Sequence, residues 1–477
     1  MTEPDTNAAP ILAAAKCPFT PPYPEPLKSK AGLLKRFVIG WNSWVHTLFE
    51  RSYTMKMGLV SLPRLKLYVV NDLDIVGRVL DDPRRQYPKH PMLMDMLGPL
   101  IGNSVFSANG QDWADQREMI NPAFAHTNLK RGYAMMLGAA QDLVATMRSQ
   151  DLTRPVDIDP MMTHVTADII FRTIFSVKLS AAEADRIYTV FKRYQTLAQR
   201  STTLGINGLP RLGYAWRTRR AAREIHAVLN GVMRARYDAR QAGERPAQAD
   251  ILEALMDARH PETGAAFTFD ELVHQTSLIF LAGHETAASA LAWALYLLSE
   301  QPALQEELYA QIEAETGGGP LEFEHIRRLE GVRNLFRETL RLYPPVGFLP
   351  RSVIKPETMR GKQVQPEDLL VIAPWLIQRN SDNWECPHSF DPDRFTKPEN
   401  AEAVRKAWLP FGGGARLCIG AGFAQQEAQI ILASVIRAFR LTHPAGRRPE
   451  LISRLTLRPR HGVPLILTPR VTTSQPD

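Results

Sequence analysis

The most informative part of this sequence is "FGGGARLCIG", residues 411–420. Three consecutive glycines precede Arg416 and Cys418, and the 477 residues contain only three cysteines. Neither G-x-x-x-x-G-K-[ST] nor G-x-G-x-x-G can be laid over the glycines, so this stretch is not a phosphate-binding loop. A zinc site is excluded as well, because no second ligand stands at a suitable spacing.

Three interpretations of Cys418 stay open. An isolated cysteine is most often a buried apolar side chain. A catalytic nucleophile would need a histidine partner, and no such motif stands nearby. A metal-bound thiolate would be favoured by the N–H groups of Gly420 and the start of the next helix. In that case Gly412 to Gly414 would let the chain pass close to a flat cofactor, and Arg416 would bind an acidic group on it.

A second informative stretch, residues 270–302, is long and apolar all round, which is typical of a helix buried in the centre of a large protein. Its middle reads "AGHET", residues 282–286. Thr286 can bond back to the carbonyl of Ala282, but an acid such as Glu285 is costly there without a partner. The alternative is functional: Ala282 and Gly283 form the thin wall of a cavity, and Glu285 and Thr286 handle protons.

A third stretch, "VRNLFRETLRLYPP" (residues 332–345), predicts a helix ended by two prolines. Glu338 and Arg341 are three residues apart and share one face, so they can form an ion pair. Such a pair is common and contributes little on a surface. Its position just before "LYPP" is what makes it informative.

The composition limits the classes of partner. The net charge is +7, with 44% hydrophobic and 22% charged residues, so a large folded core is expected. The excess of positive charge indicates either an ordinary solvated surface or a basic face for an acidic protein or an anionic membrane. The densest basic run, "RTRRAAR" at residues 217–223, has no interleaved aromatics, so we expect no nucleic-acid partner. Three cysteines without a C-x-x-C pair predict no disulfide framework, as in a reducing cytoplasmic compartment.

The overall pattern predicts one large, helix-dominated domain with a small strand-rich part. Residues 1–50 form a Pro-rich lead with an amphipathic segment at residues 27–49, which we expect to dock on its own domain, with a bilayer surface as the alternative. No secretory signal and no stretch of about 20 apolar residues is found, so a soluble chain is expected. Strands are predicted at residues 55–60, 65–70 and 368–377, and a final hairpin near His461 and Gly462. A helix stop is predicted at residues 317–320 and a last helix at residues 418–439.

Together these segments resemble the cytochrome P450 family of haem-thiolate monooxygenases. The match runs from about residue 50 to the C-terminus and comprises several ordered motifs. The family's cysteine motif is complete as Phe411, Gly414, Arg416, Cys418 and Gly420; its Glu-x-x-Arg is Glu338 and Arg341; "FDPDRF" supplies Arg394; "AGHET" is the oxygen-activating segment; and Trp-x-x-x-Arg is Trp113 and Arg117.

The resemblance implies a fold and a cofactor. The fold is the cytochrome P450 fold, an α+β single domain over residues 51–477 with haem b between the central helix and the cysteine-bearing helix. Cys418 would be the iron ligand, whose thiolate favours O–O cleavage. The other implied haem contacts are Phe411 beside the thiolate, Gly412 and Gly420 in the loop, Ala282 and Gly283 on the central helix, and Arg117, Arg351, Arg416 and Trp113 at the propionates.

The resemblance also implies roles in catalysis. Thr286 would hydrogen-bond the oxygen being activated, Glu285 would help to supply protons, and His284 would face away from the iron. Glu338, Arg341 and Arg394 would be a structural triad. Relatives commonly have His-Arg where this chain has Gln378 and Arg379, which puts only the local packing in doubt.

The implied reaction is insertion of one oxygen atom from O2, by hydroxylation or epoxidation, into a lipophilic substrate such as a fatty acid, terpenoid or steroid. The implied pocket includes Phe106, Ala282, Val346, Phe348 and Leu349. No flavin or iron–sulfur module is visible, so two electrons from NAD(P)H would arrive through a separate ferredoxin or flavodoxin and its reductase, to a monomer. The alternatives are a haem-thiolate peroxygenase or isomerase, which often lacks the Glu285–Thr286 pair, and a non-catalytic haem sensor or carrier.

Overall fold

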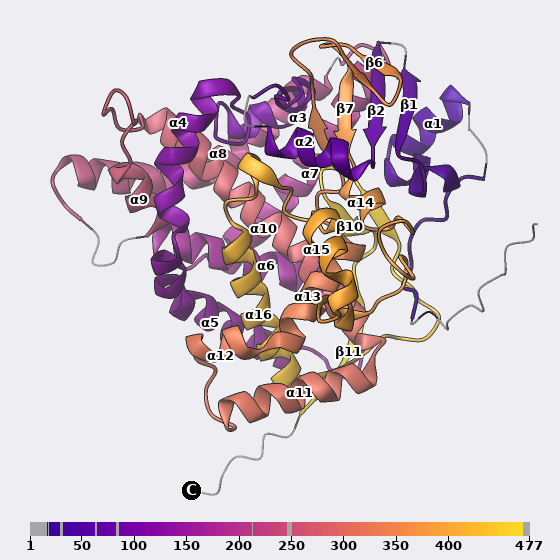
Figure 1. The fold of residues 1–477 in the computed structure, drawn as a ribbon. Coiled ribbons are helices and arrows are strands. Elements are labelled where there is room, and N and C mark those ends of the chain that lie inside the picture. Colours follow the sequence, from indigo (N-terminus) through magenta and orange to yellow (C-terminus); the bar gives the residue numbers. More distant parts are fainter. Residues whose placement is uncertain are drawn as a thin grey trace, which may run out of the picture.

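The long apolar helix α10 (Phe269–Ser299) runs through the middle of the molecule (Figure 1). The computed structural model describes residue 17 and residues 19–28, 32–62, 64–82, 85–211, 213–245 and 250–470. Thr268 caps α10, since its hydroxyl accepts from the backbone N–H of Glu271 while the Glu271 carboxylate accepts from Thr268. Almost every residue from Leu272 to Ser299 is buried, so the predicted central helix is confirmed.

Other helices surround α10. It packs most extensively on α6 (Ile158–Phe175), and also on α8, α13 and α16. The remaining helices are α1 (Leu33–Gly40), α2 (Leu73–Asp81), α3 (Met92–Ile101), α4 (Gly110–Ile120), α5 (His126–Arg148), α7 (Ala181–Ile206), α8 (Tyr214–Gln241), α9 (Ile251–Asp257), α11 (Pro302–Thr316), α12 (Phe323–Arg328), α13 (Glu330–Leu342), α14 (Pro374–Ile377), α15 (Ala401–Ala407) and α16 (Ala421–Ala438).

The strands form small sheets at the rim of the helical part. The largest has the order β1-β2-β7-β4, in which β2 pairs in parallel with β7 and the other neighbours are antiparallel. Its strands are β1 (Met57–Leu62), β2 (Leu65–Val70), β4 (Leu349–Arg351) and β7 (Leu369–Ile372); the others are β3 (Val156–Asp157), β5 (Glu357–Met359), β6 (Lys362–Val364), β8 (Phe439–Thr442), β9 (Leu451–Ser453), β10 (Leu457–Pro459) and β11 (Pro464–Pro469). The predicted mainly α fold with a small β part is confirmed.

Two local predictions are wrong. The strand predicted at residues 368–377 ends at Ile372, because Pro374 opens the short helix α14. The last hairpin turns between β9 and β10 rather than at Gly462, and β11 instead pairs with β8 and β3. Gly462 (φ +77°) lies where the chain passes close to Asp157. An added Cβ would clash with the Asp157 carboxylate, which accepts a hydrogen bond from the N–H of Val463.

The prediction about disulfides is also wrong. A disulfide joins Cys17 to Cys386, 369 residues apart in the chain. Sequence spacing could not show it, because the two cysteines meet only through the tertiary fold. Cys418 is the free cysteine among the residues that the structure describes.

The amphipathic N-terminal segment docks on its own domain, as expected. The carbonyl of Gly40 accepts from Gln199, Trp41 contacts Tyr214, and the indole of Trp44 donates to the carbonyl of Arg454 at 3.2 Å. Residues 1–16 of the predicted Pro-rich lead lie outside the described residues. Over the described ranges, α10 is the one helix long and apolar enough to cross a membrane, and it is mostly buried, as a core helix is.

Candidate active site

Cys418 lies in the turn just before α16, beside the N-terminus of that helix. Its backbone N–H donates to the carbonyl of Phe411 at 3.0 Å, which closes the loop. Burial raises the pKa of the Cys418 thiol, while the Gly420 N–H, Arg117 and Lys89 act to lower it. The thiol is nevertheless accessible. As predicted, the Gly420 N–H points at the Cys418 sulfur.

The glycines before Cys418 also determine how closely the loop approaches α2. Gly414 has a φ of +60°, and an added Cβ would lie 2.0 Å from the carbonyl oxygen of Leu80. Gly413 faces the Leu80 side chain. Gly413 and Gly414 thus let the cysteine loop lie close to the end of α2. Gly412 (φ +74°) makes the turn that only glycine adopts easily.

Four cations gather beside the cysteine loop. Arg416 donates to the carbonyl of Ala108 and to Asn109, and its guanidinium stacks on the ring of Trp113 at 4.4 Å. Arg117 donates to Asn121 Oδ1 and to the carbonyl of Leu417. The two other cations are Arg351 on β4, which donates to the carbonyl of Pro350, and Lys89, which donates to the carbonyl of Phe106.

The sequence analysis missed Lys89, because no motif marks it. Burial holds the pKa of Lys89 well below its usual range, and Arg351, Arg416 and Arg117 lower it further. Burial likewise lowers the pKa of Arg351 and of Arg416 to about 10. Lys89 is therefore close enough to the three arginines, and Arg416 to Arg351, for their charges to repel.

This cluster fits haem b. Within the described residues, none of the four cations has a carboxylate at ion-pair distance; their hydrogen-bond partners are carbonyls and side-chain amides, and Asp82 compensates Arg351 and Arg416 only from a greater distance. Uncompensated positive charge inside a protein is costly. The two propionates of haem b would supply the missing negative charge, with Arg117, Arg351, Arg416 and Lys89 as the residues that hold them.

One face of α10 lies open where the helix is otherwise buried. Ala282 is exposed, and Gly283 and Thr286 are half-buried, whereas most of the helix around them is buried. The Thr286 hydroxyl donates to the Ala282 carbonyl at 2.6 Å. His284 faces the opposite way, between Phe191 and Phe280, and its Nδ1 lies 2.6 Å from the Phe280 carbonyl. The accessible face of α10 is where a non-protein group can lie.

Glu285 points away from that face into a buried polar network. Its Oε1 accepts from Gln195 on α7 at 2.7 Å and from Thr456 at 2.9 Å, and its Oε2 accepts from Arg458 on β10 at 2.9 Å. The other arm of Arg458 donates to Asp159 at 2.8 Å. The position of Glu285 in an apolar helix predicted that it has a polar partner. Nothing in the sequence indicated that this partner is Arg458, 173 residues later.

The predicted substrate residues lie on segments that approach this region. The loop with Phe106 is tied to α10, since the N–H of Val105 donates to Gln275 at 3.1 Å. Phe348 packs on Trp44 at 3.6 Å between ring centroids, and Leu349 lies near Gly412. Phe106, Val346, Phe348 and Leu349 are each half-buried.

The triad is assembled as predicted. Glu338 binds Arg341 at 2.7 Å and Arg394 at 3.3 Å, and all three side chains are buried. Gln378, where relatives have histidine, donates to the carbonyls of Leu340 and Arg341 and accepts from the N–H of Leu409 at 2.7 Å. It thus links the end of α13 to the segment that leads to Cys418.

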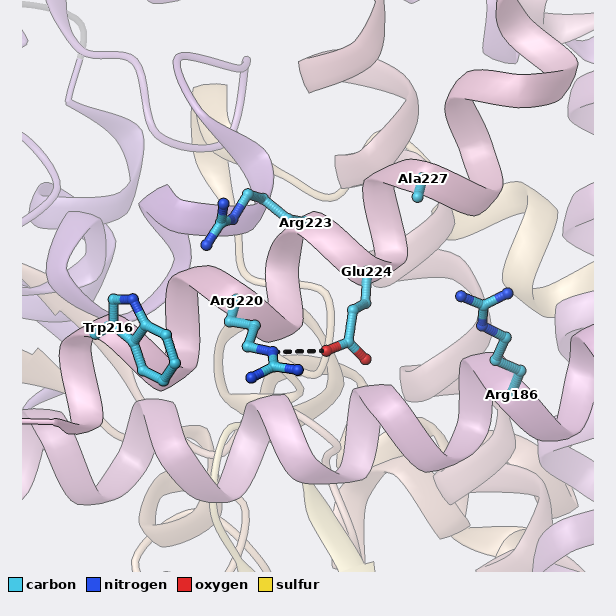
Figure 2. A pocket seen from close by; sticks show the side chains of 6 residues that line it. All are labelled: Arg186, Trp216, Arg220, Arg223, Glu224 and Ala227. Carbon is cyan, nitrogen blue, oxygen red and sulfur yellow. Dashed lines mark ion pairs between the residues drawn. The ribbon is translucent and has the colours of Figure 1, made fainter.

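A shallow hollow on the outer surface is separate from this site. Figure 2 shows it between α7 and α8, with Arg186 facing Trp216, Arg220 and Glu224 across it. Arg220 pairs with Glu224 at 3.6 Å. None of the predicted site residues lines it.

Comparison with known proteins agrees with the geometry. Cyclooctatin synthase of Streptomyces melanosporofaciens is 28% identical over 88% of this chain and 96% of its own length. The 11-oxo-beta-amyrin 30-oxidase of Glycyrrhiza uralensis is 30% identical over 83% of this chain and 76% of its own, and the cytokinin hydroxylase of Arabidopsis thaliana is 30% identical over 77% and 72%.

A solved cytochrome P450DA heme domain superposes with a TM-score of 0.77 at 23% identity, covering 95% of this chain and 98% of that one, and shows the same fold. The family model described as cytochrome P450 matches residues 37–466. The chain therefore belongs to the cytochrome P450 family, as a monooxygenase whose cofactor is haem b.

Proposed function

We propose that this enzyme inserts one oxygen atom into a lipophilic terpenoid or steroid-like substrate, using electrons from separate redox proteins. The observation that carries the proposal is the open face of α10, where Ala282 and Thr286 are accessible on an otherwise buried helix. Haem b, when bound, supplies the iron that activates dioxygen. The residues of this chain bind that group, position the substrate and move protons.

The proposed roles follow from position. The Cys418 thiol, with the Gly420 N–H beside it, is the iron ligand. Arg117, Arg351, Arg416 and Lys89 anchor the propionates. Thr286 presents a hydroxyl that can turn from the Ala282 carbonyl to donate a hydrogen bond into the site.

Glu285 connects the site to a proton source. Glu285 directly precedes Thr286 in the chain, but its carboxylate accepts hydrogen bonds from Gln195, Thr456 and Arg458. It can carry a proton toward Thr286 only by leaving Arg458, so the strength of this ion pair controls proton delivery. An acid and an alcohol retained side by side favour O2 chemistry over the peroxygenase or isomerase alternative.

The substrate class is supported by the names of relatives and by the lining. Cyclooctatin synthase and 11-oxo-beta-amyrin 30-oxidase match most of this chain. Phe106, Val346, Phe348 and Leu349 are apolar or aromatic side chains, and Lys89 lies over the Phe106 ring at 3.5 Å. Such a lining favours a rigid lipophilic molecule over a polar one.

The electron donor is proposed from charge. The net charge of +7 suits an acidic ferredoxin or flavodoxin, with NAD(P)H as the source through a reductase. Charge reversal of lysine and arginine residues on the cysteine face should slow electron transfer and leave substrate binding unchanged. Equal rates before and after reversal would contradict this partner.

The test uses Thr286→Ala with Thr286→Ser as the matched control. In the holoenzyme with a terpenoid that shifts the haem spin state, the alanine variant should consume NAD(P)H with little product, and the serine variant should retain most of its coupling. Unchanged coupling in Thr286→Ala would contradict the role of the hydroxyl. A reduced, carbon-monoxide-treated spectrum typical of histidine-ligated haem would contradict Cys418 as the ligand.

A further inference from the structure

An N-terminal strap, Cys17 with residues 19–23, lies along the loop of residues 386–390. The disulfide joins Cys17 to Cys386, and the N–H of Phe390 donates to the carbonyl of Phe19 at 2.9 Å. The hydroxyls of Thr20 and Ser389 are 3.1 Å apart. The ring of Tyr23 stacks on His388, with 4.4 Å between centroids and 12° between planes. The strap therefore contacts this loop through a disulfide, hydrogen bonds and a stacked pair of rings.

The opposite side of the same loop is held by the buried triad. Arg341 donates to the carbonyls of Pro387 at 2.7 Å and Ser389 at 2.8 Å, and Arg394 donates to the carbonyl of Glu385 at 2.8 Å. The N–H of Asp391 donates to Glu338 at 3.0 Å. The loop is thus fixed from inside by charged side chains and from outside by the strap.

A buried cation lies close to Tyr23 of the strap and to His388. Arg379 is 1% exposed, its guanidinium stacks on Trp375 at 3.6 Å, and its Nε and Nη1 have no hydrogen-bond partner among the described residues. The hydroxyl of Tyr53 accepts from the Trp375 indole at 3.0 Å, and Tyr53 contacts His388. Burial, with Arg379 and Arg341 nearby, lowers the pKa of His388 to about 3, so the ring under Tyr23 is neutral.

We propose that the Cys17–Cys386 disulfide is a reversible, thiol-sensitive link that fastens the strap over this loop, so that reduction releases the strap while the triad stays closed. Cys17 is exposed and Cys386 is half-buried, so a small thiolate can reach the Cys17 sulfur. Cys386 has a φ of +42°, a backbone conformation that favours glycine, so a cysteine there is not an ordinary loop residue. The inference does not depend on the proposed substrate.

The exchange is balanced by a dithiol reductant. Its thiolate attacks Cys17 Sγ, a mixed disulfide forms, and Cys386 leaves as a thiolate and takes a proton. The second thiol of the reductant then closes the reductant's own disulfide and releases the Cys17 thiol. Two electrons and two protons pass to the protein, and an oxidised dithiol or glutathione disulfide reverses the reaction.

The exchange rates of two neighbouring amides distinguish release of the strap from opening of the loop. The Phe390 N–H is bonded to the strap, whereas the adjacent Asp391 N–H is bonded to the triad through Glu338. When the strap leaves, the Phe390 amide loses its partner and exchanges with solvent. The Asp391 amide keeps its own, because no hydrogen bond or ion pair joins the triad to the described residues of the strap.

The experiment is hydrogen exchange on the full-length holoenzyme, treated with glutathione disulfide or with dithiothreitol. Mass spectrometry first checks for a cross-linked peptide pair containing Cys17 and Cys386. Reduction should then speed exchange at Phe390 by at least about tenfold and leave Asp391 unchanged. The variants Cys17→Ser and Cys386→Ser should exchange fast at Phe390 under both treatments, which controls for any effect of thiols at Cys418.

Three results would overturn the proposal. The first is the absence of the cross-linked peptide after oxidation. The second is a Phe390 rate in the wild type that reduction does not change. The third is equal acceleration at Asp391, since the triad would then have opened together with the strap.

Discussion

Arg458 and Glu285 form a buried ion pair, with Nη1 and Oε2 2.9 Å apart, and the same guanidinium binds Asp159 at 2.8 Å. One strand residue thereby holds two acids from two core helices. Burial raises the pKa of the Asp159 carboxyl, and Arg458 opposes that rise. Among the described residues, Arg458 is the only cation that forms an ion pair with either acid.

Arg458→Met should destabilise the protein by about 3–5 kcal/mol, because it leaves two buried carboxylates without a counter-charge. Urea unfolding of the holoenzyme measures this as a lower midpoint. Arg460→Met is the matched control, since Arg460 pairs with Glu450 at the surface, with both side chains more than half exposed. A loss no larger than that of the control would show that Glu285 and Asp159 do not need Arg458.

Glu427→Gln should stabilise the protein increasingly as the pH rises. Glu427 on α16 is fully buried, neither carboxyl oxygen has a partner within the described structure, and burial raises its pKa well above the usual range. Between the unfolded and folded pKa values the unfolded state binds fewer protons, so wild-type stability falls by about 1.4 kcal/mol per pH unit. The glutamine variant lacks this loss.

Unfolding at pH 5, 6 and 7 would compare wild type, Glu427→Gln and the exposed control Glu399→Gln. The gap between Glu427→Gln and wild type should widen with pH, whereas the control should run parallel to wild type. A gap independent of pH would mean that Glu427 does not stay protonated in the folded protein.

Lys89→Met should affect the haem-free and haem-bound forms in opposite directions. Without haem, the substitution removes a buried cation that three arginines repel and should raise stability. With haem, it removes a charge-assisted bond worth about 1.5–3 kcal/mol, so haem loss to an acceptor protein should speed up by about tenfold or more. Lys66→Met on β2 is an exposed control for both. Slower or equal haem loss in Lys89→Met would exclude a propionate contact.

Gln378 should tolerate histidine better than leucine. The amide satisfies two carbonyls and one N–H. An imidazole can keep one donor and one acceptor, so Gln378→His should cost about 1 kcal/mol. Gln378→Leu leaves all three backbone groups unpaired and should cost at least about 3 kcal/mol. Unfolding midpoints rank the two, and equal losses would show that packing, not hydrogen bonding, sets the preference.

The sequence predicted those features that local pattern determines. The long apolar stretch at residues 270–302 predicted a central helix, and Gly317 to Pro320 predicted a helix stop. The triad was predicted because a family motif marks each member. Pattern and motif together also located Cys418, Arg416 and Thr286, and the structure places each on the expected segment.

What the sequence could not predict depends on residues that meet only in three dimensions. Lys89 has no motif, and its role emerges from three arginines that lie far from it in the chain. The sequence could not identify Arg458, because the C-terminal segment was predicted as a single hairpin. The strand pairing there instead involves Asp157, which accepts from the N–H of Val463. The contact of Gly413 and Gly414 with the end of α2 is a tertiary contact that the sequence could not show.

The parallel pairing of β2 with β7 constrains how this protein is made in the cell. Leu67 finds its partner Leu369 only after some 300 further residues have been synthesised, which at about 5–20 residues per second takes on the order of 15–60 s. During that interval β2 can pair with β1, but its other edge stays unpaired and open to aggregation. Chaperones that shield nascent chains should therefore raise the yield of folded enzyme more than any change in translation speed.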